Sequence, residues 1–192
     1  SFHPAGHVLG SAQIAVERGG LRIVVSGDYK RRRDPTCAAF EVVPCDVFIT
    51  EATFGLPVFR HPDATDEIVR LLKSARQFPE RAHLVGAYAL GKAQRVMRLL
   101  REAGHDAPIY IHGALQKLSE YYQEQGIALG RLEPATVQGG AKGEFAGVQQ
   151  EDAVGVDLDQ FGEVGEVFLD VDHGTRVVPE HEEPVVEREV HR

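Results

Sequence analysis

The chain has 192 residues, a formal net charge of −8 and a hydrophobic content of 43%. This length suits one medium domain or pieces of two, and the composition is ordinary for a globular protein. No apolar run approaches the roughly 20 residues that span a bilayer, and the first residues do not have the basic-then-apolar pattern typical of a signal peptide. Two cysteines, Cys37 and Cys45, are too few for a disulfide framework. We therefore expect a cytoplasmic protein without a membrane partner.

The charge is unevenly distributed along the chain. Residues 143–192 hold 14 acidic residues against three arginines, whereas residues 1–142 hold 18 basic and 15 acidic residues. A mildly basic body favours contact with a phosphate backbone, which an acidic tail would repel. The first 142 residues are therefore where we look for a nucleic-acid site.

The predicted secondary structure changes along the chain from an antiparallel hairpin to alternating strands and helices. Alternating apolar residues at 13–18 and 21–25 flank Gly19-Gly20 and predict an antiparallel hairpin. Strands and helices then alternate, the helices being indicated by apolar residues at 3.6-residue spacing. They are a strand at 46–51, a helix at 65–77, a strand at 82–88, a helix at 92–103, a strand at 109–112 and a helix at 114–125. Such alternation predicts a parallel α/β unit.

The composition changes again beyond about residue 136. This stretch is rich in Val, Glu, Asp and Gly, and no lysine follows Lys142. Residues 163–171 favour strands, and residues 179–192 are typical of a solvated acidic tail.

Three polar residues stand where chemistry is expected. His7 lies in a glycine-containing loop that also holds His3, which suits delivery of imidazole to a metal. Asp28 follows Gly27 at the end of an apolar strand, and a carboxylate there has two oxygens with which to bridge two ions. Glu51 ends the next strand. Taken singly, each has a plainer interpretation: a structural histidine, a turn or capping aspartate, and a solvated strand end.

Order and spacing favour the chemical interpretation. The motifs AGHVLGSA (residues 5–12), SGDY (26–29) and TEATFG (50–55) together resemble the β-CASP nucleases, which have a metallo-β-lactamase fold. That group includes the endonuclease of mRNA 3′-end cleavage, the RNase J enzymes and the DNA cross-link repair nucleases. The stretches TEATFGLPVF (50–59), GAYALGKAQR (86–95) and PIYIHG (108–113) are similar to its bacterial branch of ligase-associated DNA exonucleases. The resemblance covers about residues 1–134.

The resemblance implies a fold and a set of roles. The fold is α/β: part of a metallo-β-lactamase αββα sandwich at 1–58, followed by part of an inserted β-CASP α/β domain at 59–136. Residues 137–192 form an acidic tail for which a shifted reading frame is one explanation. His7 is expected to bind one zinc, and Asp28 to bridge two divalent metal ions, expected to be zinc. Glu51 is expected to support a histidine near the leaving group, and His3 is not a ligand.

The chain also departs from the family pattern. The main metal motif, His-x-His-x-Asp-His, is expected upstream of Ser1, so we interpret the chain as beginning within a domain. The later family motifs do not follow Pro134, and Asp172-His173-Gly174 is only superficially similar to one of them. The metal site is therefore predicted to be incomplete, and this chain alone to be inactive.

The resemblance further implies a metal-dependent phosphodiester hydrolase whose parent is a DNA exonuclease in repair, with an ATP-dependent DNA ligase and a helicase as partners. The alternatives are an RNA-processing β-CASP nuclease and a non-catalytic remnant. The basic run after Asp28 is a weaker candidate for phosphate contact, with a solvated loop as the alternative. It comprises Lys30, Arg31, Arg32 and Arg33. His112 is expected to be structural rather than cleft-facing.

Overall fold

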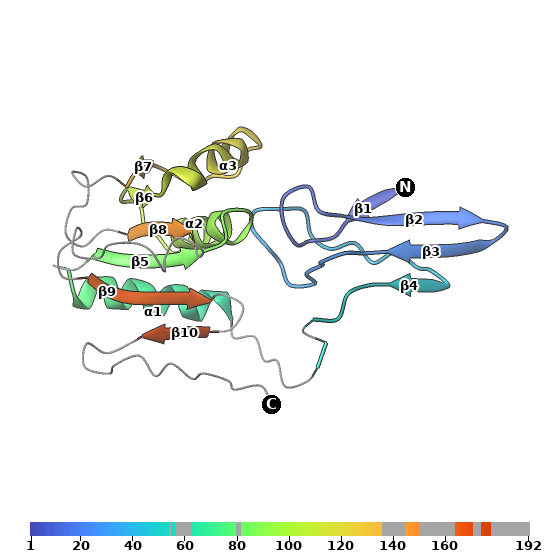
Figure 1. Ribbon diagram of the computed structural model, residues 1–192, viewed down its shortest axis with the longest axis horizontal. Coiled ribbons are helices and arrows are strands. Elements are labelled where there is room, and N and C mark those ends of the chain that lie inside the picture. The colour runs from blue at the N-terminus through green and yellow to red at the C-terminus, as the bar shows by residue number, and fades with distance from the viewer. Residues whose placement is uncertain are drawn as a thin grey trace, which may run out of the picture.

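Two sheets occupy opposite ends of the long axis of the molecule (Figure 1). The computed structural model describes residues 1–53, 55–56, 63–79 and 82–135, together with the strand backbones at 145–149, 164–170 and 174–177. A four-stranded sheet is built from the first 49 residues, and a six-stranded sheet with three helices from the rest. The predicted hairpin and the predicted helices therefore lie in two separate parts of the molecule.

The four-stranded sheet has the order β1-β2-β3-β4. Its strands are β1 (Phe2–Pro4), β2 (Ala12–Arg18), β3 (Leu21–Val25) and β4 (Val47–Ile49). β2 and β3 form the predicted hairpin, and both turn glycines have positive φ, +61° at Gly19 and +82° at Gly20, as a tight turn between twisted strands requires. β4 adds in parallel beside β3. β1, which pairs with β2, was not predicted.

One side of this sheet is apolar and faces solvent. The pairing register puts Ile14 opposite Val25 in the hairpin, and Val25 beside Ile49 of β4. These three side chains are 40 to 53% exposed, whereas Gln13 and Ala15, on the other side of β2, are buried. We call the exposed side the apolar face. Its members are Phe2, Ile14, Val16, Ile23, Val25, Val47 and Ile49.

The six-stranded sheet carries the helices and has the order β10-β9-β5-β8-β6-β7. Its elements begin with α1 (Ala64–Gln77), β5 (Ala82–Ala87), α2 (Lys92–Glu102), β6 (Ile109–Ile111), α3 (Gly113–Glu124) and β7 (Leu132–Pro134). The backbones of β8 (Phe145–Gln149), β9 (Val164–Asp170) and β10 (Gly174–Val177) complete it. Every pairing is parallel except that of β10 with β9. The predicted parallel α/β unit is confirmed from α1 onward, with element ends within two residues of those expected. Its predicted first strand, at 46–51, is instead β4, which pairs with β3 of the hairpin in the four-stranded sheet.

A single apolar core joins the helices to this sheet. α2 contacts both α1 and α3. The buried members include Ile68 and Leu71 of α1, Leu100 of α2, and Leu115 and Tyr122 of α3, each 1% exposed. Burying one such side chain stabilises the fold by about 1.5–3 kcal/mol. Tyr121, the neighbour of Tyr122, is 52% exposed, so one tyrosine of this pair lies in the core and the other at its rim.

Three strands fall in the region interpreted as an acidic tail. β9 lies within the stretch 163–171 that favours strands, whereas β8, between β5 and β6, was not predicted. Residues 179–192 and His173 lie outside the described residues, so the interpretation of 137–192 stays a prediction. Where the chain is described, none of its helices has both the length and the apolarity needed to cross a membrane.

Candidate functional site

The hairpin brings His7 and Asp28 together. His7 lies in the loop between β1 and β2, and Asp28 follows β3, so the two residues stand at the same end of the paired strands. The distance from His7 Nε2 to Asp28 Oδ2 is 3.5 Å. That is longer than a hydrogen bond of about 2.7–3.2 Å. Two ligands of one tetrahedral zinc, each bonded at about 2.0–2.2 Å, lie about 3.3–3.6 Å apart. The separation therefore fits two ligands of one ion, as the roles implied by the resemblance require.

Backbone contacts hold the two loops against each other. The Lys30 N–H donates to the Ala5 carbonyl at 3.0 Å. Lys30 is two residues after Asp28, and Ala5 is two residues before His7. Gly6 has φ +70°, and a Cβ there would overlap the Lys30 carbonyl oxygen. A side chain at this position would therefore push the loops apart. The glycine before His7 is needed both for its own conformation and for the approach of the Asp28 loop.

The loop that carries His7 is also closed on itself. We call residues 5–11 the His7 loop. The Ser11 hydroxyl accepts hydrogen bonds from the backbone N–H groups of His7 and Val8, at 3.1 and 3.2 Å. The Ala5 N–H donates to the Ser11 carbonyl at 3.0 Å. These contacts fix the backbone on both sides of the imidazole.

Glu51 lies within electrostatic reach of this pair. The Thr53 N–H donates to Glu51 Oε2 at 2.7 Å, and this hydrogen bond holds the pKa of the Glu51 carboxyl below its usual value. A weaker contribution to the same lowering of the pKa comes from the charge of His7. Glu51 is exposed just beyond the end of β4, so it is a solvent-facing carboxylate rather than a buried acid. All three predicted site residues therefore gather at one end of the sheet.

The donors present fit part of a zinc site. An imidazole nitrogen and a carboxylate oxygen are donors that zinc accepts, and a hydrolytic zinc usually has about three protein ligands. Among the residues that the structure describes, no group of three or more His, Cys, Asp or Glu side chains is arranged to hold a metal ion. His7 and Asp28 are 38 and 69% exposed. The pair therefore offers two ligands that are open to further donors.

The other two histidines discussed above have structural partners. His3 Nδ1 lies 2.8 Å from Glu41 Oε1, and His3 Nε2 lies 2.9 Å from Ser1 Oγ. Both ring nitrogens of His3 are engaged away from Asp28. His112 is the N-cap of α3, where its ring accepts a hydrogen bond from the Ala114 N–H at 3.3 Å. The structural placement expected for His112 is confirmed.

The basic run after Asp28 is divided by the fold. Lys30 Nζ donates to Asp34 Oδ2 at 2.9 Å, and the Asp34 side chain is 2% exposed. The Lys30 charge is thus neutralised within the protein. Arg31, Arg32 and Arg33 are exposed. Phosphate contact by this run remains a prediction, and these three arginines suit it better than Lys30.

Sequence reasoning missed Asp34. Its Oδ1 accepts hydrogen bonds from the Thr36 N–H at 3.0 Å and the Thr36 hydroxyl at 2.6 Å, and its Oδ2 lies 3.5 Å from Arg95 Nε of α2. The run Asp34-Pro-Thr36 is typical of a turn in which an aspartate caps the chain two residues on. That pattern, directly after four basic residues, was the available sequence signal.

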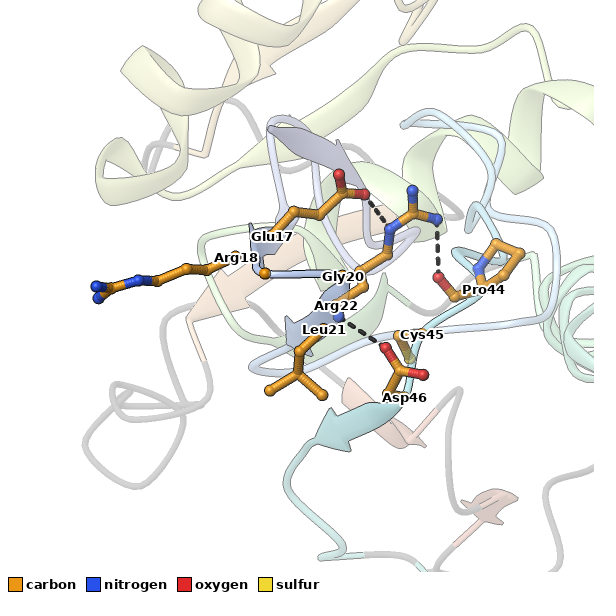
Figure 2. A pocket seen from close by; sticks show the side chains of 9 residues that line it. Glu17, Arg18, Gly20, Leu21, Arg22, Pro44, Cys45 and Asp46 are labelled. Carbon is orange, nitrogen blue, oxygen red and sulfur yellow. Dashed lines mark hydrogen bonds and ion pairs between the residues drawn. The ribbon is translucent and has the colours of Figure 1, made fainter.

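A pocket of about 570 Å³ lies away from this site (Figure 2). It surrounds the Gly19-Gly20 turn, at the opposite end of β2 from His7. Arg22 crosses it to pair with Glu17 and to donate to the Pro44 carbonyl at 3.1 Å, while the Arg22 N–H donates to Asp46 Oδ2 at 2.7 Å. These contacts tie the segment before β4 to the hairpin.

The chain is similar to curated proteins over part of its length. It is 35% identical over 122 residues to "Cleavage and polyadenylation specificity factor 73" of Drosophila melanogaster, covering 59% of this chain and 18% of that protein. It is 36% identical over 124 residues to "Endoribonuclease ysh1" of Aspergillus fumigatus, covering 62% and 13%. It is 29% identical over 145 residues to "Probable DNA ligase" of Opitutus terrae, covering 72% and 14%.

These relationships are distant and partial. The chain spans less than a fifth of the length of the relatives named above. No family model matches it. Two of the three relatives carry names for RNA processing and one carries a name for DNA joining, so the similarity extends to both kinds of nucleic-acid enzyme.

Proposed function

We propose that this chain is a segment of a metal-dependent phosphodiester hydrolase of the β-CASP group, which has a metallo-β-lactamase fold. The observation that carries the proposal is the 3.5 Å separation of His7 Nε2 and Asp28 Oδ2. Two donors that are 21 residues apart in sequence and meet at the ligand spacing of one ion are what a metal site needs. The distant similarity to an endoribonuclease supports the same class of reaction.

The apolar face supports the assignment of residues 1–58 to part of a sandwich. An apolar side of a sheet must be buried against another layer of the fold. Here one side is covered and the other exposes a continuous row of aliphatic residues, Val16 at 55% among them. A second layer from the same protein would cover this row and would place further metal ligands at the open side of His7 and Asp28.

The chain's own residues divide the work of the reaction. His7 would donate its Nε2 lone pair as a neutral imidazole, and Asp28 would offer its two carboxylate oxygens to neighbouring ions. Two bound divalent ions would acidify a water and neutralise the phosphate oxygens. Glu51, held by Thr53 and ionised, would orient a proton-donating group near the leaving oxygen. The exposed arginines at 31–33 would contact the phosphate backbone.

We propose DNA as the substrate class of the parent protein, which would act as an exonuclease in repair beside an ATP-dependent ligase and a helicase. The match to "Probable DNA ligase" covers 72% of this chain, more than the matches to the two RNA-processing proteins cover. RNA is the second candidate, because those two proteins are more nearly identical to the chain. None of the site residues described above selects one sugar over the other.

Two proteins test the proposal. The 192-residue chain alone should bind zinc weakly and leave end-labelled DNA and RNA intact, because it provides two of about three ligands. A fusion that adds the His-x-His-x-Asp-His segment and the C-terminal half of a full-length relative should cleave one of these strands, and a chelator should stop it. The preferred strand decides between DNA and RNA.

Variants of the fusion assign the residues. His7→Ala and Asp28→Ala should abolish cleavage and reduce bound zinc, whereas Glu51→Ala should lower turnover and leave zinc content near that of the parent. His3→Ala is the matched control, because both its ring nitrogens are engaged elsewhere. A fusion whose cleavage survives His7→Ala would overturn the assignment. Chelator-sensitive cleavage by the chain alone would show that it holds a complete site.

A further inference from the structure

Helices α2 and α3, which pack on the six-stranded sheet, contact the loops that carry His7 and Asp28. The backbone N–H of Leu9 donates to the Tyr122 hydroxyl of α3 at 3.3 Å. Val8 lies against Gly91, the N-cap of α2, so closely that a Cβ on Gly91 would overlap the Val8 side chain. The His7 loop is therefore held from one side by its own Ser11 and from the other by α2 and α3.

A second connection runs from α2 to the Asp28 loop. Arg95 of α2 lies 3.5 Å from the Asp34 carboxylate, and Asp34 accepts a hydrogen bond from Lys30 at 2.9 Å. Lys30 is two residues beyond Asp28, and its N–H also donates to the Ala5 carbonyl. The buried side chain of Asp34 thus links α2 to the backbone between the two loops.

The helix side chains that make the two connections are both buried, as is Asp34. Tyr122 is 1% exposed, and burial raises the pKa of its hydroxyl, as does the nearby negative charge of Asp34. Arg95 is 7% exposed and Asp34 4%. In a buried setting, hydrogen bonds and ion pairs are stronger than at a surface, and each partner has one favourable place.

We infer that Tyr122 and Arg95 are positioning residues, through which helices α2 and α3 set the separation of His7 and Asp28. Neither side chain is proposed to touch substrate or metal. Tyr122 acts on the His7 loop through the Leu9 N–H, and Arg95 acts on the Asp28 loop through Asp34 and Lys30. Because a metal site loses affinity when its ligands are misplaced, α2 and α3 would tune a site to which they contribute no ligand.

The effect on metal affinity rests on the proposed function, whereas the effect on loop geometry does not. The test therefore uses two readouts on the 192-residue chain labelled with nitrogen-15. The first is amide exchange at Leu9 together with nuclear Overhauser contacts between His7 and Asp28. The second is titration with Co²⁺ alone, followed by the paramagnetic shift of the His7 ring resonances. The melting temperature is recorded for each variant.

Tyr122→Phe keeps the buried ring and removes the hydroxyl. Losing this hydrogen bond should speed Leu9 exchange and weaken Co²⁺ binding at His7, each by about three- to tenfold. Tyr121→Phe is the matched control, since Tyr121 is the exposed neighbour on the same helix, and it should change neither readout. Arg95→Met should weaken Co²⁺ binding, and Arg95→Lys should restore part of it because the charge beside Asp34 returns.

The outcomes separate the two proposals. If Tyr122→Phe leaves both Leu9 exchange and Co²⁺ affinity at parental values, Tyr122 is not a positioning residue. The positioning role is likewise overturned if Tyr121→Phe weakens Co²⁺ binding as much as Tyr122→Phe does, or Arg95→Lys as much as Arg95→Met does. If the parent chain binds no Co²⁺, the metal assignment fails, and the positioning role is decided by whether Tyr122→Phe loses the His7–Asp28 contacts that the parent shows.

Discussion

At the scale of single residues, the approach of His7 to Asp28 depends on the absence of a side chain at Gly6. Its φ of +70° is one that residues with a side chain rarely adopt. A Cβ at this position would overlap the Lys30 carbonyl oxygen and would lie 2.8 Å from the Phe40 backbone nitrogen. Both neighbours are backbone atoms, which cannot rotate away as a side chain does. The two loops can therefore touch only where no Cβ intervenes.

Gly6→Ala should be far more harmful than Gly10→Ala. Both glycines have positive φ, but nothing lies within 4 Å of a Cβ at Gly10. Gly10→Ala should lower the free energy of unfolding by about 1 kcal/mol from backbone strain. Gly6→Ala should lower it by about 3 kcal/mol, because overlap with backbone adds to the strain. Urea denaturation of the two variants measures the difference, and equal losses would contradict the close approach.

The two cysteines should differ in reactivity. Burial, with the negative charge of Asp34 as a second cause, raises the pKa of the Cys37 thiol to about 11, whereas Cys45 is exposed. The thiolate is the reactive form, so at pH 8 about 0.1% of Cys37 is available. Iodoacetamide should modify Cys45 first, and the Cys37 rate should rise about tenfold per pH unit up to about pH 11.

Mass spectrometry of the two modified peptides measures these rates, and in denaturant the two cysteines should react alike. Rapid modification of Cys37 in the folded chain at pH 8 would show that its thiol is more open than the structure has it.

At the scale of elements, one arginine closes the end of α2. Arg101 donates to backbone carbonyls in the segment before β6 and in the segment before β7, and its guanidinium fills the space where a side chain at Gly130 would lie. The carbonyls are those of His105 and Ala107, both at 2.6 Å, Leu129 at 2.8 Å and Arg131 at 2.9 Å. Two connecting segments are thereby fixed by a single side chain.

Arg101→Leu should therefore lower the free energy of unfolding by about 3 kcal/mol, because several carbonyls lose a charged donor. Arg98→Leu, on the same helix, should cost less than about 1 kcal/mol. Arg98 donates to one exposed carbonyl, that of Ala128 at 3.2 Å, and pairs with Glu102 near the surface. Denaturation of both variants tests this ranking. A larger loss of unfolding free energy in Arg98→Leu than in Arg101→Leu would contradict the role given to Arg101.

The sequence predicted most of the elements because their patterns are local. The hairpin follows from the Gly19-Gly20 turn and alternating apolar residues, and α2 from apolar residues at helical spacing up to Gly104. β1 and β7, each three residues long, were missed, whereas the equally short β4 and β6 were predicted because they lie within the apolar stretches 46–51 and 109–112. The meeting of His7 with Asp28 was predictable from the hairpin. The turn at Asp34 had a sequence signal, but its ion pair with Arg95 did not, since Arg95 lies on a helix far along the chain.

At the scale of the whole molecule, the apolar face is the largest departure from what a stable sheet requires. Large exposed apolar patches mark surfaces that another layer covers, or surfaces that aggregate. In this chain the face is built by register, since each strand places its aliphatic residues on the same side. The chain on its own should therefore self-associate through this sheet.

Substitution of two residues of the face tests this. Ile14→Thr with Val16→Thr keeps β-branched side chains and makes the exposed surface polar. The doubly substituted chain should sediment as a smaller species and bind less hydrophobic dye, with a stability change below about 1 kcal/mol. The control Val24→Thr, at a 0% exposed position, should lose about 2 kcal/mol. In the longer fusion the double substitution should instead destabilise, because the face would then be buried.

The position of β8 has a consequence for how the chain is made. β8 pairs with both β5 and β6, yet residues 112–144 lie between β6 and β8. During synthesis the hairpin finds its partner strand almost at once, whereas β5 and β6 emerge with an empty place between them. Their open edges stay available for pairing with other chains until residue 149 has left the ribosome. The pace of translation over this stretch therefore sets how long the nascent protein is exposed to misassembly.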